Sequence, residues 1–289
     1  MVEHGFRRRP LFFRKMADIL SRTFALLSVA LAVSGMIWII WVTISYGAGA
    51  LSWEFLLEPT RPWGLPKNGV ANAIIGTILV TFGAAVIGVP PAILGGIYLS
   101  EFGKHSQIGS FMRFCTNVMM GMPSIIIGLF VYAVMVVPTG RFSGFAGSLA
   151  LAVIMFPVVM RTTEDILLMV SDTLRESALA LGMSRTRTTL CIVCRSGRTG
   201  LITGILLAIA RAGGETAPLL FTAMWSDAWP TRYFSQPTAN LPVLINEYAT
   251  NSPYDEVQAM GWGAALLITA AILGMNIVSR IFFREKKHG

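Results

Sequence analysis

Long uncharged runs of apolar residues recur along the chain, separated by shorter polar segments. An α-helix needs roughly 20 apolar residues to cross the hydrocarbon layer of a bilayer. Because lipid offers no hydrogen-bond partner to bare backbone, each long run is predicted to be a helix rather than a strand. The predicted spans cover residues 23–46, 70–99, 114–137, 142–160, 199–224 and 257–279. The expected fold class is therefore all-α integral membrane, a bundle of six transmembrane helices.

The composition fits this reading. Hydrophobic residues make up 54% of the 289 positions and charged residues only 13%, about half the charge of a soluble domain. Of the three cysteines, Cys191 and Cys194 have the spacing of half a zinc site. No second Cys or His pair lies nearby, so a structural role is expected and no metal site is predicted.

Positive charges sort by side of the membrane. Most of the 23 Lys and Arg residues lie before the first span, in the segment 161–198 and at the C-terminus, whereas the alternate connections hold few. The positive-inside rule then places both termini in the cytoplasm. This sorting explains the net charge of +8 without nucleic acid as a partner.

The domain organisation follows from these boundaries. Residues 1–22 are predicted to be a basic cytoplasmic arm that contacts lipid headgroups, and residues 284–289 a cytoplasmic tail. Residues 23–283 form one transmembrane domain with a cytoplasmic loop at about 161–198. The first span is too long for a secretory signal, so it is expected to be retained.

A short helix is predicted within the cytoplasmic loop. Thr173 and Glu176 have the spacing of a capping box, and Gly182 can supply a left-handed stop. The helix would cover residues 174–181, which is too short to be stable alone in water. It should therefore dock on something through one apolar face, formed by Leu174, Ala178 and Leu181.

This loop carries a resemblance. Glu176-Ser177-Ala178, followed by Gly182, is similar to the E-A-A-x-x-x-G signature of binding-protein-dependent ABC permeases. In that family the helix couples the permease to a cleft of an ATPase subunit. The sequence departs from the family pattern at Cys194 and Arg195, where the family has Leu-Pro. Without that proline, the chain is expected to bend less sharply where it leaves the coupling segment. The alternative is an ordinary loop helix with no coupling role. The residues expected to carry the ATPase contact are Arg175, Glu176, Ala178, Gly182 and Arg185.

Three further segments, 89–101, 121–129 and 208–220, resemble the phosphate-import permeases of that family, and the resemblance covers roughly residues 70–280. It implies a second, homologous permease subunit (PstC-like), an ATPase subunit dimer (PstB-like) and an extracytoplasmic phosphate-binding protein (PstS-like). It also implies the bacterial cytoplasmic (inner) membrane as the location.

Two opposite charges lie within the fifth predicted span. Arg211 and Glu215 are four residues apart, on one helical face. A charge at that depth costs at least about 2.5 kcal/mol, so it should face protein or water. Glycines at 213 and 214 and Pro218 predict irregular backbone there, a pattern typical of transporter sites.

The substrate-pathway hypothesis follows from these charges. Arg211 can bind a passing phosphate in a bidentate way, Glu215 would tune or gate it, and Thr216 belongs to the same motif. A purely structural Arg211–Glu215 bridge is the alternative. Arg161, at the inner end of the fourth span, is either a pathway residue or an anchor at the headgroups.

The chain contains no G-x-x-x-x-G-K-S/T phosphate loop, so no catalytic residue and no bound cofactor are predicted. ATP and Mg would enter through the partner ATPase. The predicted function is half of the translocation pathway of an ATP-driven phosphate importer. The alternatives are an importer of sulfate, molybdate or phosphonate, or an ion-driven secondary transporter. The latter should hold several mid-membrane acidic residues, whereas Glu215 is the only one in the predicted spans.

Overall fold

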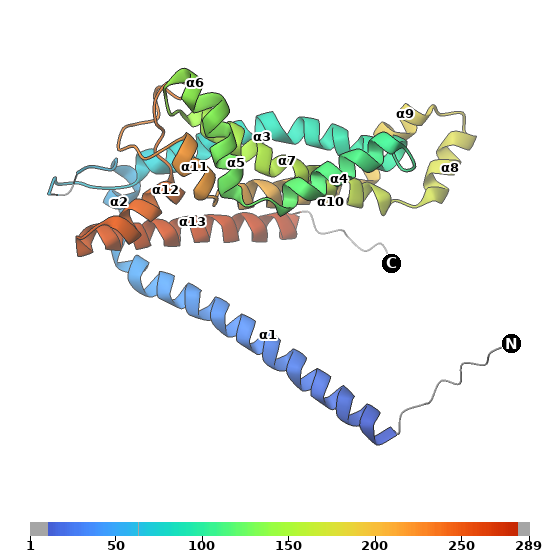
Figure 1. Ribbon diagram of the computed structural model, residues 1–289, viewed down its shortest axis with the longest axis horizontal. Helices are drawn as coiled ribbons and strands as arrows, with labels where there is room; N and C mark the ends of the chain where they lie inside the picture. The colour runs from blue at the N-terminus through green and yellow to red at the C-terminus, as the bar shows by residue number, and fades with distance from the viewer. Residues whose placement is uncertain (1–10, 63, 283–289) are drawn as a thin grey trace.

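The computed structural model describes residues 11–62 and 64–282, and every regular element in these ranges is helical (Figure 1). The predicted tail and residues 1–10 of the predicted arm lie outside them. The α-helices are α1 (Leu11–Gly47), α2 (Trp53–Leu57), α3 (Ala71–Ile97), α4 (Gln107–Gly121), α5 (Ser124–Val131), α6 (Val137–Thr139), α7 (Gly144–Leu168), α8 (Asp172–Ala180), α9 (Arg185–Thr188), α10 (Cys194–Ala212), α11 (Ala217–Thr222), α12 (Leu241–Ile245) and α13 (Asp255–Phe282). A 3₁₀ turn, η1 (Ala48–Ala50), and four π-helical segments, η2 (Tyr98–Phe102), η3 (Tyr132–Val136), η4 (Thr189–Val193) and η5 (Asn246–Asn251), extend them.

Within the described residues, five helices are long and apolar enough to cross a membrane, and six spans result if one bent pair counts as a span. In that pair, Gln107–Gly121 and Ser124–Thr139 meet at an angle of 102°. Met122 and Pro123 between them have extended backbone, because a proline disfavours helical geometry in the residue before it. The third predicted span, 114–137, therefore lies within this bent pair, with the bend at Met122 and Pro123.

The fifth predicted span also has different limits. A continuous helical run covers Arg185–Ala212, so it begins before residue 199 and ends before residue 224. At the other side of the predicted loop, α7 continues to Leu168. The connection between these two long helices, which contains α8, is residues 169–184, and it lies within the predicted loop at about 161–198. Hydropathy marks the apolar part of a helix, whereas these helices continue through basic turns beyond it.

The core is built on the close approach of α3 and α7. A Cβ added at Gly88 would lie 2.9 Å from the Ala152 carbonyl oxygen, and one at Gly96 would lie 2.5 Å from the Thr163 Cβ. Small residues let backbones come this close in membrane bundles. The main buried cluster joins this pair to α10, α11 and α12 and comprises Val80, Ala84, Leu151, Ala152, Met155, Ala212, Leu219, Ala223 and Val243.

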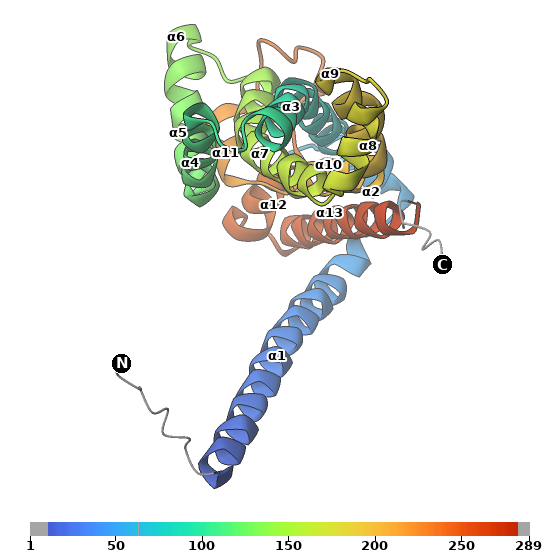
Figure 2. The ribbon, with the colours of Figure 1, turned by 90° about the vertical axis from the view of Figure 1, so that its right-hand side faces the viewer.

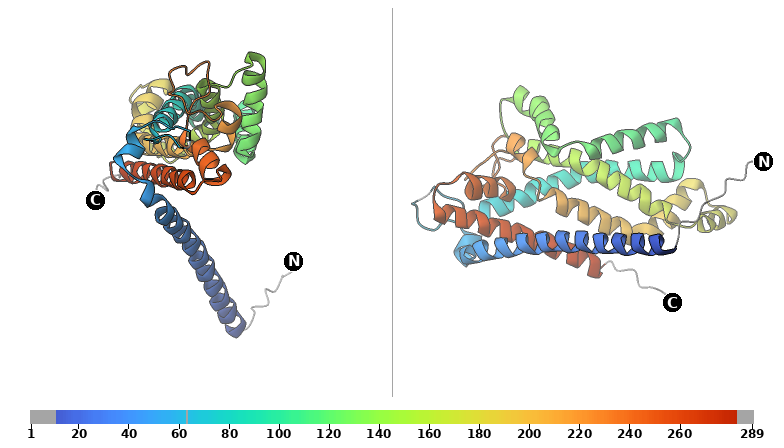
Figure 3. Two further views of the ribbon diagram at one scale, coloured as in Figure 1. Left: turned by 90° about the vertical axis from the view of Figure 1, so that its left-hand side faces the viewer. Right: turned by 60° about the horizontal axis from the view of Figure 1, so that its bottom comes forward.

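The first helix diverges from the bundle (Figures 1 and 2). It meets the rest of the described chain near Gly47, where the Tyr46 and Trp262 rings lie 5.5 Å apart. The right-hand view of Figure 3 shows that the N-terminal end of α1 and the C-terminal end of α13 point toward the end that carries α8 and α9. The two described ends and α8 therefore lie at the same end of the molecule, while the cytoplasmic location of that end stays a prediction.

Candidate functional site

The helix that carries Arg211 breaks directly after it. Instead of continuing the helical ladder, the Gly214 N–H donates to the Arg211 carbonyl oxygen at 3.1 Å and the Glu215 N–H to that of Ala212 at 3.1 Å. A new helix, α11, starts at Ala217, with Pro218 in its first turn, where a missing N–H costs nothing. The predicted irregular backbone is confirmed.

The two charged side chains at this break lie near each other without a tight bond. Arg211 Nε and Glu215 Oε1 are 4.0 Å apart, too far for a hydrogen bond. The Arg211 side chain is 70% exposed, whereas that of Glu215 is 20% exposed. The separation favours an available guanidinium over a closed structural bridge.

Arg211 and Glu215 line a pocket of about 150 Å³ between α4, α5, α7 and the α10–α11 break. Its other walls are apolar or weakly polar: Met119, Met120, Met122, Ser124, Ile127, Ile154, Pro157 and Val158. The 102° bend between α4 and α5 brings the three methionines to this pocket, since Met122 lies at the bend itself. The bend therefore shapes the candidate site.

The other two predicted pathway residues lie at its edge. Thr216 does not line the pocket, and its carbonyl oxygen accepts from Leu219 and Leu220 in the first turn of α11. Arg161 forms ion pairs with Glu164 and with Asp165, both at 3.3 Å. It stands one turn of α7 beyond Pro157, which does line the pocket. Arg161 is therefore held by acidic partners next to the site rather than within it.

A buried ion pair beside Arg161 was not predicted from the sequence. Arg113 Nε donates to Glu164 Oε1 at 2.6 Å, and the Glu164 side chain is only 2% exposed. Arg113 also donates to the carbonyl oxygens of Leu99 and Gly103. It thus ties α4 to α7 and to the end of α3. The sequence signal was a pair of acids, Glu164 and Asp165, just beyond the inner end of one predicted span and Arg113 just before another.

The helix predicted in the basic loop exists, but its start differs. Its N-cap is Ser171 and it covers Asp172–Ala180, so the capping box at Thr173 was wrong. In the first turn, the Asp172 carboxylate, which is 75% exposed, lies 3.1 Å from Arg175, a surface pair that contributes little, and an acid there suits the helix dipole. The predicted stop is confirmed, because Gly182 has φ +83°.

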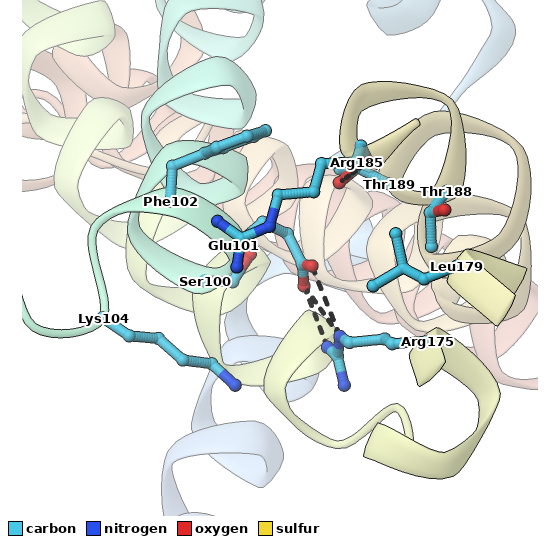
Figure 4. A pocket seen from close by; sticks show the side chains of 9 residues that line it. All are labelled: Ser100, Glu101, Phe102, Lys104, Arg175, Leu179, Arg185, Thr188 and Thr189. Carbon is cyan, nitrogen blue, oxygen red and sulfur yellow. Dashed lines mark hydrogen bonds and ion pairs between the residues drawn. The ribbon is translucent and has the colours of Figure 1, made fainter. Parts of the chain in front are cut away.

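Figure 4 shows how α8 is joined to the bundle: Arg175 points inward to Glu101 of η2. Arg175 Nη2 lies 2.9 Å from Glu101 Oε1, and the two side chains are 11% and 10% exposed. The same guanidinium donates to the carbonyl oxygens of Leu167, at 2.6 Å, and of Val170. One side chain therefore joins α8 to the ends of both central helices, α3 and α7.

The opposite surface of α8 is open. Glu176 is exposed on it. Arg185, at the start of α9, is also exposed but lines the same pocket as Glu101 and Arg175. Of the three residues expected to form an apolar docking face, only Ala178 is buried, and Leu174 and Leu181 are 39% and 85% exposed. The described part of this chain does not cover these two leucines, and what the face docks on stays a prediction. The chain thus leaves an apolar and charged surface on α8 for another molecule.

Comparisons with known proteins agree with these features. Residues 92–288 match the family described as "Binding-protein-dependent transport system inner membrane component". A relative from Yersinia pestis named "Phosphate transport system permease protein PstA" is 42% identical over 98% of this chain and 95% of its own length. A protein of the same name from Pasteurella multocida is 43% identical over 94% and 96%. A solved structure of the MetNI methionine ABC transporter, in an inward-facing conformation, superposes with a TM-score of 0.57 at 17% identity, over 75% of this chain and 93% of that one.

Proposed function

The chain belongs to the family of binding-protein-dependent transport system inner membrane components, and from that premise we propose that it is the transmembrane permease subunit of an ATP-driven phosphate importer. Curated relatives that share about two fifths of its residues over nearly its whole length are named as phosphate transport permeases. They are permease subunits and not catalytic subunits. The chain forms half of the translocation pathway.

One observation carries this proposal: the exposed side chain of Arg211 lies at a helix break within an apolar bundle. A guanidinium that is 70% exposed cannot face hydrocarbon without a cost of at least about 2.5 kcal/mol. The exposed side of Arg211 must therefore face water or a partner subunit. A water-filled path between two permease subunits meets this requirement, and it places a bidentate anion donor on the path.

The subunit acts within a transporter complex. The second half of the path comes from a homologous permease subunit, and phosphate arrives on an extracytoplasmic binding protein. A dimer of ATPase subunits, with ATP and Mg bound to it, docks on the open surface of α8. The complex resides in the bacterial cytoplasmic membrane, with the α8 end of this chain in the cytoplasm.

Ion pairs between the helices of this chain suit this coupling. When the ATPase dimer closes, it moves α8, and Arg175 transmits the movement to Glu101 and the carbonyl oxygens at the end of α7. Further along α7, the Arg113–Glu164 pair connects this movement to α4. Since α4 and α7 both line the Arg211 pocket, ATP-driven motion can open and close it.

The test is transport by the complete complex. The complex should be reconstituted in vesicles with ATP and its binding protein, and uptake of radiolabelled phosphate measured with sulfate, molybdate or phosphonate as competitors. We expect phosphate uptake that depends on ATP and resists equimolar competitors. Uptake of another oxyanion in place of phosphate would contradict the substrate. Uptake driven by an ion gradient without ATP would contradict the transporter class.

A further inference from the structure

A further pocket opens at the end of the molecule opposite α8 and α9. Its volume is about 400 Å³, and it is lined by the loop after α2, the α11–α12 connection, η5 and the start of α13. These elements gather at the left of Figure 1, while α8 and α9 lie at the right. No lining residue is shared with the Arg211 pocket. It is therefore a separate feature of the other face.

The pocket carries unneutralised acid. Asp227 is exposed and Glu247 half-buried, and neither forms an ion pair with a Lys or Arg in the described part of the chain. Glu247 accepts one hydrogen bond from the Asn251 amide at 3.3 Å. Arg61 also lines the pocket, but its guanidinium pairs with Glu58 at 3.4 Å. The lining is thus left with negative charge.

Aromatic rings form part of the same wall. The Trp225 and Tyr248 rings lie 5.3 Å apart, and both line the pocket. Burial, together with the nearby Asp227 carboxylate, raises the pKa of Tyr248 to about 12, so its hydroxyl stays protonated and able to donate. Carboxylates beside aromatic faces suit a cation, because the carboxylates attract its charge and the rings add cation–π attraction.

The same charges exclude phosphate as the occupant. Two carboxylates repel a phosphate anion, so this pocket is not a stage of the anion path. A side chain that ends in a positive charge fits the chemistry of this pocket. The molecule that must approach this face during import is the one that delivers phosphate.

We propose that this acidic pocket, formed around Asp227, Glu247, Trp225 and Tyr248, receives a Lys or Arg side chain of the extracytoplasmic phosphate-binding protein when that protein docks. The inference rests on the proposed function, because it requires such a partner at this face. The contact fixes the orientation of the donor over the permease and speeds its encounter, as charge complementarity does at transient interfaces.

The test uses the reconstituted complete transporter and titrates phosphate-loaded binding protein while ATP hydrolysis is measured. The double variant Asp227→Asn/Glu247→Gln removes both charges with little change in shape. The matched control Asp255→Asn/Glu256→Gln removes two exposed acids from the first turn of α13, which do not line the pocket. Size-exclusion chromatography of each purified complex checks assembly.

We expect the pocket variant to raise the half-maximal concentration of binding protein about tenfold, which is the loss expected when one or two charge contacts at the edge of an interface are removed. The maximal rate should stay within twofold, and the salt dependence of the half-maximal concentration should weaken. The control should match wild type. Equal shifts in both variants, or no shift in either, would overturn the proposal. A fall in maximal rate alone would assign the pocket to translocation instead. Failure of the wild-type complex to import phosphate would refute the proposed function independently.

Discussion

The Glu101–Arg175 pair gives the most direct check on how α8 is coupled to the bundle. Replacing Glu101 by Gln keeps the shape and one acceptor but removes the charge from a pair in which the two side chains are only 10% and 11% exposed. A hydrogen bond to a charged group contributes about 1.5–3 kcal/mol. A loss of about 2 kcal/mol would raise the population of undocked α8 about 30-fold.

Two assays on the complete complex measure this loss. Amide hydrogen exchange in residues 172–183 should accelerate by about the same factor in the nucleotide-free state, since exchange follows local opening. The number of phosphate ions imported per ATP hydrolysed should fall, because a loosened α8 moves without moving α3. The matched control is Asp172→Asn, which removes a partner of Arg175 that is 75% exposed and should change either quantity little. Unchanged exchange and unchanged stoichiometry in Glu101→Gln would refute the coupling role of the pair.

Three further predictions concern the joints around the site. Gly182→Ala places a side chain at φ +83° and should destabilise the end of α8 by about 1 kcal/mol, seen as lower ATPase stimulation by binding protein at unchanged complex yield. Arg113→Ala leaves the 2% exposed Glu164 with weaker compensation, which costs about 3–5 kcal/mol, and should lower the melting temperature of the purified complex; Arg113→Lys should recover part of it. Gly128→Ala would bring a Cβ to 2.6 Å from Pro218 Cα, and the resulting strain of about 1–3 kcal/mol should lower uptake more than ATP hydrolysis, because it shifts α11 beside the pocket.

Hydropathy predicted which segments are long apolar helices but not where a helix is broken. Four of the six predicted spans correspond to the unbroken helices α1, α3, α7 and α13. The third span bends because Pro123 interrupts it, whereas Pro157 lies inside a continuous α7. A proline in an apolar run therefore does not by itself show whether the helix breaks there.

The candidate site shows the same division. Arg211 and Glu215 could be found from the sequence because they are rare charges in an apolar run, with glycines and a proline that predict a break. The pairs Glu101–Arg175 and Arg113–Glu164 join residues 74 and 51 positions apart, and only the packed fold brings them together. The periodicity of α8 predicts an apolar face but not which molecule covers it, and the described part of the chain leaves Leu174 and Leu181 exposed.

The central claim is that Arg211 faces the anion path. Its most direct test is the initial rate of phosphate uptake by the reconstituted complex carrying Arg211→Ala, compared with Arg141→Ala, an exposed arginine in the α6–α7 connection away from the pocket. With equal complex yields, we expect Arg211→Ala to lose uptake by at least about tenfold, the effect of one charged contact, while Arg141→Ala matches wild type. Wild-type uptake by the assembled Arg211→Ala complex would contradict the account.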